Sequence, residues 1–180
     1  MSLTFAPRRA ERRQRTRLRR TFAVDAAIIC SATAALAHLG AAPGHYTWWP
    51  AAGVFFAALG VAQLVYSVLL VRGVHDQRFV FAGIWGTVGV ILLYVASRTV
   101  GLPSTPPVPI HGGRWVVGRS IVADGAKHVG SLDVFTLVAE ILLVVTLLSM
   151  LPSRSKARAV NHLMWIGLAL WGAAVVGLMR

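Results

Sequence analysis

Charged residues are scarce in this chain of 180 residues: they make up 13% of it, and only six of them are acidic. Soluble domains carry roughly 25% charged residues, so the composition excludes a soluble globular domain. The single cysteine, Cys30, excludes an intrachain disulfide, a cysteine-based zinc site and an iron–sulfur cluster. The chain also lacks a Walker loop, a dinucleotide-binding fingerprint and a nucleophile elbow, so no motif indicates an enzyme class.

Long apolar runs are what the sequence has instead. Hydrophobic residues make up 56% of it, and they form five blocks of about the 20 residues that a helix needs to cross the hydrocarbon core. In lipid every backbone polar group must be satisfied within the segment, so these runs are expected to be helices. We therefore predict an all-α, polytopic membrane bundle at 22–180, after a basic leader at 1–21. The five transmembrane helices are expected at residues 22–39, 49–71, 79–97, 132–151 and 160–179.

The basic residues are distributed unevenly along the chain. With the amino terminus in the cytoplasm, thirteen of the eighteen arginines and lysines face the cytoplasm, eight of them in the leader. Because cytoplasmic loops carry an excess of arginine and lysine, we expect a cytoplasmic amino terminus and an extracytoplasmic carboxyl terminus. The leader is expected to contact anionic lipid headgroups. Topology explains its charge, so nucleic acid is not expected as a partner.

The amino-acid composition is biased toward residues with GC-rich codons. Arginine outnumbers lysine by sixteen to two, and alanine, valine and glycine are abundant. This bias is typical of a GC-rich bacterial genome. We therefore expect the protein in the cytoplasmic (inner) membrane of a bacterium.

The first apolar block has a second interpretation. A basic leader, an apolar core and the triplet Ala35-Leu-Ala37 resemble a cleavable secretory signal, and Arg19-Arg20-Thr-Phe22 resembles a twin-arginine export motif. Cleavage would leave His38 at a new amino terminus, where it could bind copper together with His45. The leader is long and Asp25 interrupts the core, so an uncleaved helix is favoured. The glycines and the proline at 40–44 are expected to end that helix.

Residues 98–131 form the only long connection, which is expected on the outer side as a lid over the helix ends. The segment 114–122 is interpreted either as a short strand or as an interfacial segment. The connection is longer than closure requires, and loops of this size often carry function. A partly disordered loop is the other interpretation.

Ionisable residues inside apolar blocks are candidates for function, because burying them costs several kcal/mol unless they are paired or hydrated. Glu140 lies about nine residues into the fourth predicted helix, roughly 12–13 Å below the outer boundary at about 1.5 Å per residue. We interpret it either as a proton-carrying or ligand-binding carboxyl, or as a helix-packing hydrogen-bond partner of Gln63 on the second helix.

Asp133 lies seven residues before Glu140, which puts both carboxyls on nearly the same helix face. They are about 10 Å apart along the axis, too far to share one ion. Asp133 is level with Arg98 at the outer end of the third predicted helix. We therefore predict a structural Arg98–Asp133 ion pair that holds the long loop against the bundle.

Four of the six histidines are expected at the outer membrane face. A cluster of histidines and a carboxylate would suit zinc or copper, and two histidines would suit a haem. The candidate metal ligands are His38, His45, His128 and Asp133. No HxxxH or HExxH spacing accompanies them, so a metal or haem site is an alternative rather than the leading hypothesis.

Several short motifs between His38 and Glu140 form a recognisable set. They are His38…His45, Trp48-Trp49, Gly53-Val-Phe55-Phe56 with Gln63, Ser97-Arg98-Thr99-Val-Gly101-Leu-Pro103, and Val129-Gly130-Ser-Leu-Asp133 with Glu140. This set resembles a family of small, uncharacterised actinobacterial multi-pass membrane proteins. The resemblance implies no activity, but it groups His38, Arg98, Asp133 and Glu140 as recurring polar residues.

The leading hypothesis is a membrane protein that binds a small ligand or ion in a polar pocket on the outer side, without covalent chemistry. The expected pocket residues are Glu140, Asp133, His38, Arg98 and Gln63. The first alternative is an accessory or assembly subunit that docks on a larger membrane complex or on a second copy of itself. The second is a metal- or haem-binding membrane protein. An enzyme is less expected, because no nucleophile accompanies the candidate acids and bases.

Overall fold

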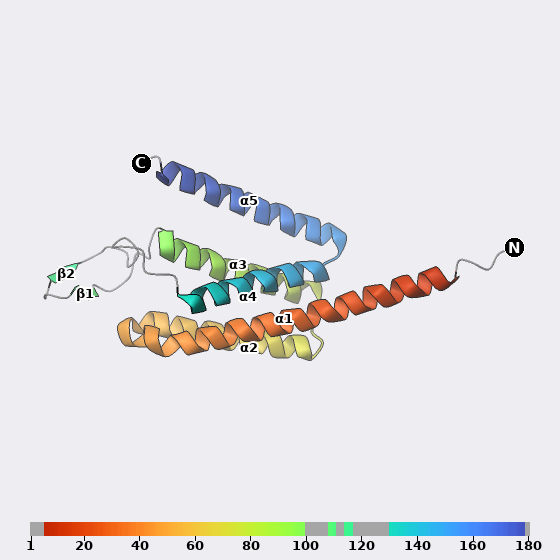
Figure 1. The fold of residues 1–180 in the computed structure, drawn as a ribbon, viewed down its shortest axis with the longest axis horizontal. Coiled ribbons are helices and arrows are strands. Elements are labelled where there is room, and N and C mark those ends of the chain that lie inside the picture. Colours follow the sequence, from red (N-terminus) through yellow and green to blue (C-terminus); the bar gives the residue numbers. More distant parts are fainter. Residues whose placement is uncertain (1–5, 100–107, 111–113, 117–129, 179–180) are drawn as a thin grey trace.

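The computed structural model describes residues 6–99, 108–110, 114–116 and 130–178, with side chains described within 22–47, 49–97 and 130–172. The elements, in chain order, are α1 (Ala6–Trp48), α2 (Pro50–Val71), α3 (Gln77–Thr99), β1 (Val108–Ile110), β2 (Arg114–Val116), α4 (Ser131–Met150) and α5 (Ser153–Leu178). Figure 1 shows the helices running lengthwise in alternating directions. The predicted all-α architecture is confirmed for the described residues, with one short hairpin added.

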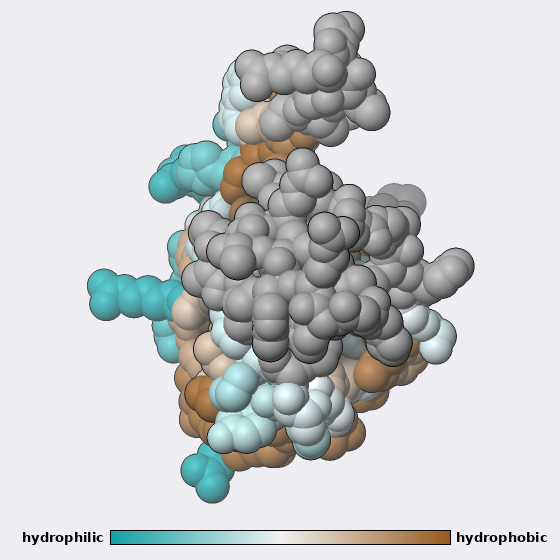
Figure 2. Space-filling view, turned by 90° about the vertical axis from the view of Figure 1, so that its left-hand side faces the viewer, coloured by the Kyte–Doolittle hydropathy of each residue, from teal (hydrophilic) through white to brown (hydrophobic). Residues whose placement is uncertain are grey.

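Four helices are long and apolar enough to cross a membrane. They comprise Phe22–Thr47 within α1, Pro50–Val71, Gln77–Ser97 within α3, and Ser131–Met150. Viewed toward the end that carries β1 and β2, the bundle shows hydrophobic surface along its rim, where lipid would lie (Figure 2). These helices are compatible with a membrane protein. The fifth predicted block lies in α5, and both its membrane crossing and the orientation of the termini remain predictions.

The first helix is longer than the sequence predicted at both ends. It begins at Ala6, so the basic leader belongs to one continuous helix, and it passes Pro43 to end at Trp48. The break predicted at residues 40–44 is therefore wrong. Pro43 has no N–H to donate and its ring crowds the carbonyl one turn earlier, but bonds after it, such as Trp49 N to His45 O (2.8 Å), are present and continue the helix.

Small residues allow α1 to approach its neighbours closely. The buried face of α1 is a stripe at spacings of three and four residues, which consists of Ala23, Ala27, Ser31, Ala34, Ala35, His38 and Ala42. On α2, a methyl group at Gly60 would lie 2.9 Å from the carbonyl oxygen of Ala35 and 2.7 Å from Cγ of Leu39. Close backbone approach at small residues is how helices pack in membranes. The α1–α2 contact therefore depends on glycine at position 60.

The apolar core lies toward the end of the bundle where α2 joins α3 and α4 joins α5. It is built by Leu70 of α2, Val80 and Ile84 of α3, and Leu143 and Leu147 of α4, all of which are buried. α3 and α4 lie side by side in Figure 1, and Leu70 adds α2 to the cluster of buried side chains that they share. Toward β1 and β2 from this core, the buried residues include His38, Gln63 and Glu140 as well as small apolar residues.

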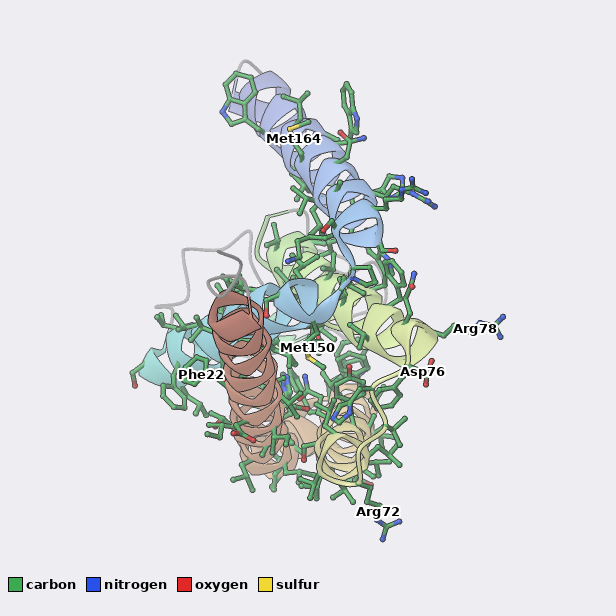
Figure 3. The ribbon with its side chains drawn as sticks, turned by 90° about the vertical axis from the view of Figure 1, so that its right-hand side faces the viewer. Phe22, Arg72, Asp76, Arg78, Met150 and Met164 are labelled. Atoms are coloured by element: carbon green, nitrogen blue, oxygen red, sulfur yellow. The ribbon has the colours of Figure 1, made fainter. Side chains whose placement is uncertain are left out.

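The connection between α2 and α3 is a tight turn with its own capping residue. Gly73 adopts a φ of 85°, which residues with a side chain rarely adopt. Asp76 Oδ1 accepts hydrogen bonds from the backbone N–H groups of Arg78 (3.0 Å) and Phe79 (3.1 Å), and it thereby caps α3. Figure 3 shows Arg72 and Arg78 pointing outward at this end, toward which the leader part of α1 also extends.

The hairpin lies within the long connection. β1 and β2 pair antiparallel, with Pro109 opposite Trp115. Figure 1 places them beyond the end of α3 and the start of α4. For the segment 114–122, the strand interpretation is confirmed over Arg114–Val116, and residues 117–122 lie outside the described residues.

Candidate functional site

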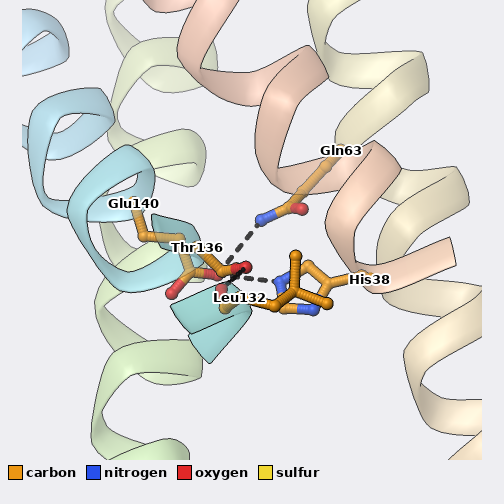
Figure 4. Close-up of polar contacts among 5 residues, drawn as sticks. All are labelled: His38, Gln63, Leu132, Thr136 and Glu140. Carbon is orange, nitrogen blue, oxygen red and sulfur yellow. Dashed lines mark hydrogen bonds and ion pairs between the residues drawn. The ribbon is translucent and has the colours of Figure 1, made fainter. Parts of the chain in front are cut away.

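Three polar side chains from three helices meet inside the bundle (Figure 4). His38 of α1 places its Nε2 atom 3.0 Å from Oε1 of Glu140 on α4. Gln63 of α2 donates from Nε2 to the same Oε1 atom at 3.5 Å. His38 is 6% exposed, Gln63 is 8% exposed and Glu140 is 2% exposed. We refer to His38, Gln63 and Glu140 as the polar cluster.

Helix packing brings the cluster together. His38 lies on the small-residue face of α1, which packs against both α2 and α4. Gln63 follows Gly60 by one turn on α2, whose close approach at Gly60 is to α1, and its side chain reaches Glu140 on α4. Glu140 lies on the buried face of α4, next to Ala139 and one turn before Leu143. Sequence analysis predicted Glu140 at depth and Gln63 as a possible partner, and both are found in contact.

One acceptor of the cluster has no hydrogen-bond partner. Oε1 of Gln63 is buried and unpaired among the described residues. Thr136, which lies close by in Figure 4, donates its hydroxyl to the carbonyl of Leu132 on its own helix at 2.8 Å. Leaving a buried acceptor unsatisfied costs about 1–3 kcal/mol. The cluster is therefore a hydrogen-bonded network with one open position.

Two residues at the cluster were not expected from the sequence. Ser31 Oγ donates to the main-chain oxygen of Gln63 (2.8 Å). The ring of Phe56 lies between two imidazoles, with its centroid 5.6 Å from that of His38 and 4.3 Å from that of His45. Ser31 lies seven residues before His38, and Phe56 lies seven residues before Gln63. This spacing puts the two residues of each pair on one helix face, and it is the pattern in the sequence that could have indicated them.

His45 lies in the last turn of α1, two turns beyond His38. Its Nδ1 atom lies 2.9 Å from the carbonyl oxygen of Ala41, and because a carbonyl only accepts, the imidazole donates. The ring packs on Phe56. His45 is therefore separated from the polar cluster by an apolar ring.

Asp133 acts at the start of α4, two turns before Glu140. Its Oδ2 atom accepts a hydrogen bond from the backbone N–H of Gly130 at 3.3 Å, in a capping arrangement. Arg98 is the penultimate residue of α3, and its side chain lies outside the described residues. The predicted Arg98–Asp133 ion pair therefore remains a prediction.

The candidate metal ligands are only partly described. Within the described residues, no group of three His, Cys, Asp or Glu side chains is arranged to hold a metal ion. His38 is paired with Glu140, His45 with a main-chain carbonyl, and Asp133 with the start of its own helix. His128 lies outside the described residues. A zinc, copper or haem site gains no support from these positions.

Comparison with known proteins found no matching family model, no matching curated protein and no matching solved structure. The resemblance to an actinobacterial membrane family thus remains an expectation from the sequence motifs.

Proposed function

We propose that the chain is a multi-pass protein of a bacterial cytoplasmic membrane that binds a small ion or ligand at the polar cluster, in the outer half of the bundle. The observation that supports the proposal is the hydrogen bonding of Glu140 to His38 and Gln63 from two other helices, at 2% exposure. Ionisable residues buried in membrane helices mark binding or transport sites by default.

Depth supports a functional role for this carboxyl. Glu140 lies nine residues after Ser131, the first residue of α4, which is about 13 Å along the axis at 1.5 Å per residue. The hydrocarbon core is about 30 Å thick, so the carboxyl lies well inside it. At that depth a charged group is costly unless it is compensated. A site for an ion or polar ligand is the role that such a residue serves.

The open position of the cluster distinguishes ligand binding from helix packing. A network that serves packing alone is stable only when every member is satisfied, because a partly satisfied buried network is costly. Here Oε1 of Gln63 has no partner among the described residues. A bound ligand would complete the network, which supports binding over a purely structural bond between α2 and α4.

A panel of small ions tests the proposal. Purified protein in nanodiscs is titrated calorimetrically with ammonium, methylammonium, tetramethylammonium, sodium and formate. Glu140→Gln removes the carboxylate but retains similar shape, and Asp25→Asn removes an exposed acid from α1 as the matched control. We expect at least one ion to bind the wild type and Asp25→Asn but not Glu140→Gln, with all three proteins equally helical. Failure of all five ions, or equal binding to Glu140→Gln, would contradict the proposal.

A second candidate function is that of an accessory or assembly subunit, which the surface of α5 favours. Figure 1 shows α5 diverging from α3 and α4 toward its carboxyl end. Its exposed apolar side chains include Trp165 (58%) and Trp171 (65%), and such aromatic residues are enriched in protein interfaces. Purification in mild detergent with a stoichiometric partner, lost in Trp165→Ala/Trp171→Ala, would support this function. A protein that purifies without a partner and still binds an ion would contradict this second function.

A further inference from the structure

We infer that the ligand of the polar cluster is a small cation that donates hydrogen bonds, of the ammonium or primary-amine class. This assignment rests on the proposed function, since it names the ligand of the same site. Two observations support it independently. One is the sign of the charge in the cluster, and the other is the kind of polar atom that lacks a partner.

The charge of the cluster favours a cation. Glu140 is the acid in contact with it, and the next acid on α4, Asp133, lies two turns away and caps the helix. His38 is the basic side chain beside Glu140, with Nε2 3.0 Å from Oε1, whereas the described arginines Arg72 and Arg78 lie at the opposite end of the bundle (Figure 3). An anion would place a second negative charge beside Glu140 at low dielectric, where like charges repel strongly. A cation would instead compensate the carboxylate.

The unpaired atom favours a hydrogen-bond donor. The Nε2 group of Gln63 is directed at Glu140, and the Oε1 atom of the same amide is the buried acceptor without a partner in the described part of the chain. An amide oxygen accepts up to two hydrogen bonds. An N–H group of an ammonium ion or primary amine would satisfy it. A quaternary ammonium has the same charge but no donor, so it would leave Oε1 unsatisfied.

The packing of the helices limits the size of the ligand. Gly60, one turn before Gln63, brings α2 so close to α1 that a single added methyl group would lie 2.9 Å from the Ala35 carbonyl oxygen. The ring of Phe56 covers His38 on the side of His45. We therefore assign ammonium or a short primary amine rather than a polyamine or a bulky base.

The selectivity of the wild-type protein tests the inference without any mutation. The wild type in nanodiscs is titrated calorimetrically with methylammonium, tetramethylammonium and formate at one ionic strength. We expect methylammonium to bind at least roughly ten-fold more tightly than tetramethylammonium, because only methylammonium can donate a charge-assisted hydrogen bond to Oε1 of Gln63. Formate is expected not to bind.

A variant of Gln63 identifies the atom responsible. Gln63→Met keeps an unbranched side chain of similar length and removes the acceptor, and it should weaken methylammonium binding roughly ten- to hundred-fold. Ser67→Ala is the matched control, because Ser67 is buried one turn further along α2 and donates to Leu64 O within its own helix. It should bind methylammonium like the wild type.

The possible outcomes separate the inference from the proposed function. Equal binding of tetramethylammonium, tighter binding of formate, or unchanged affinity in Gln63→Met would overturn the assignment of a donor cation. If such binding still requires Glu140, the proposed function stands. If none of these three probes binds a folded wild type, the assignment of a donor cation fails, and the proposed function fails as well only when ammonium and sodium also do not bind.

Discussion

The Nε2 atom of His38 lies 3.0 Å from the Oε1 atom of Glu140, although the two residues are 102 positions apart in the chain. The contact arises because α1 packs against α4 as well as against α2, and both residues are buried where the helices meet. Each side chain is the polar partner that the other needs in an apolar environment. Removing Glu140 therefore leaves the buried imidazole without this partner, and removing His38 leaves Glu140 with only the longer bond from Gln63, at 3.5 Å.

We expect the stability effects of the two residues to be strongly non-additive. His38→Ala and Glu140→Ala should each destabilise the protein by roughly 3–5 kcal/mol, which is typical for removing one member of a buried pair. The double variant should cost less than the sum by at least about 1 kcal/mol. The free energy of unfolding of the wild type, the two single variants and the double variant is measured by reversible unfolding in detergent, monitored by circular dichroism.

A control cycle uses a neighbour that bonds only locally. Thr136 donates to Leu132 O on its own helix, so Thr136→Val and His38→Ala should be additive within about 0.5 kcal/mol. Additivity in the His38–Glu140 cycle as well would show that the two residues do not depend on each other, contrary to the geometry.

Gly60 and Gly86 should respond oppositely to the same substitution. A methyl group at Gly60 would meet Leu39 Cγ at 2.7 Å and the Ala35 carbonyl oxygen at 2.9 Å, whereas at Gly86 it would meet no atom within 4 Å. Gly60→Ala should therefore destabilise the protein by roughly 1–3 kcal/mol through overpacking. Gly86→Ala should be neutral or stabilise by up to about 1 kcal/mol, because alanine favours helix. The unfolding midpoints of the two variants are compared at the same detergent concentration. Equal midpoints would refute the close contact at Gly60.

The depth of Glu140 was predictable because helical rise is constant and the apolar block around it is uninterrupted. Its partners were harder to predict, since the depth of a residue does not tell which way its helix is rotated. Before the fold was known, Gln63 was the expected hydrogen-bond partner of Glu140, and Arg98 was that of Asp133. The contact with Gln63 depends on how α2 and α4 both pack against α1, and Asp133 bonds to the start of its own helix. Both are consequences of packing and capping in three dimensions.

The end of the first helix was mispredicted for a related reason. Gly40 and Pro43 weaken a helix in water, where exposed backbone groups can turn to solvent. In an apolar environment the backbone has no such alternative, and helices tolerate both residues. The helix therefore continues to Trp48, which keeps His45 on the same rigid element as His38.

Cysteine labelling should establish the orientation of the bundle. In a Cys30→Ser background, Ser104→Cys lies in the long 98–131 connection and Ser155→Cys near the start of α5. The distribution of arginine and lysine predicts that the first is outside and the second inside. A membrane-impermeant maleimide added to intact cells should label Ser104→Cys at once, and Ser155→Cys only after the membrane is opened. The reverse pattern would invert the topology and place the polar cluster in the cytoplasmic half.

The basic leader should make the stability of the protein depend on anionic lipid. α1 has 43 residues, about 64 Å at 1.5 Å per residue, which is about twice the thickness of the hydrocarbon core. Its arginine-rich part therefore extends beyond the hydrocarbon core, and each basic residue close to an anionic surface contributes about 1 kcal/mol of attraction. Replacing Arg17, Arg19 and Arg20 with glutamine should reduce the rise in melting temperature on moving from zwitterionic to phosphatidylglycerol nanodiscs. Lysine at the same positions retains the charge and should retain the rise, and added salt should diminish it in both. If the wild type melts at the same temperature in zwitterionic and phosphatidylglycerol nanodiscs, the leader serves topology alone.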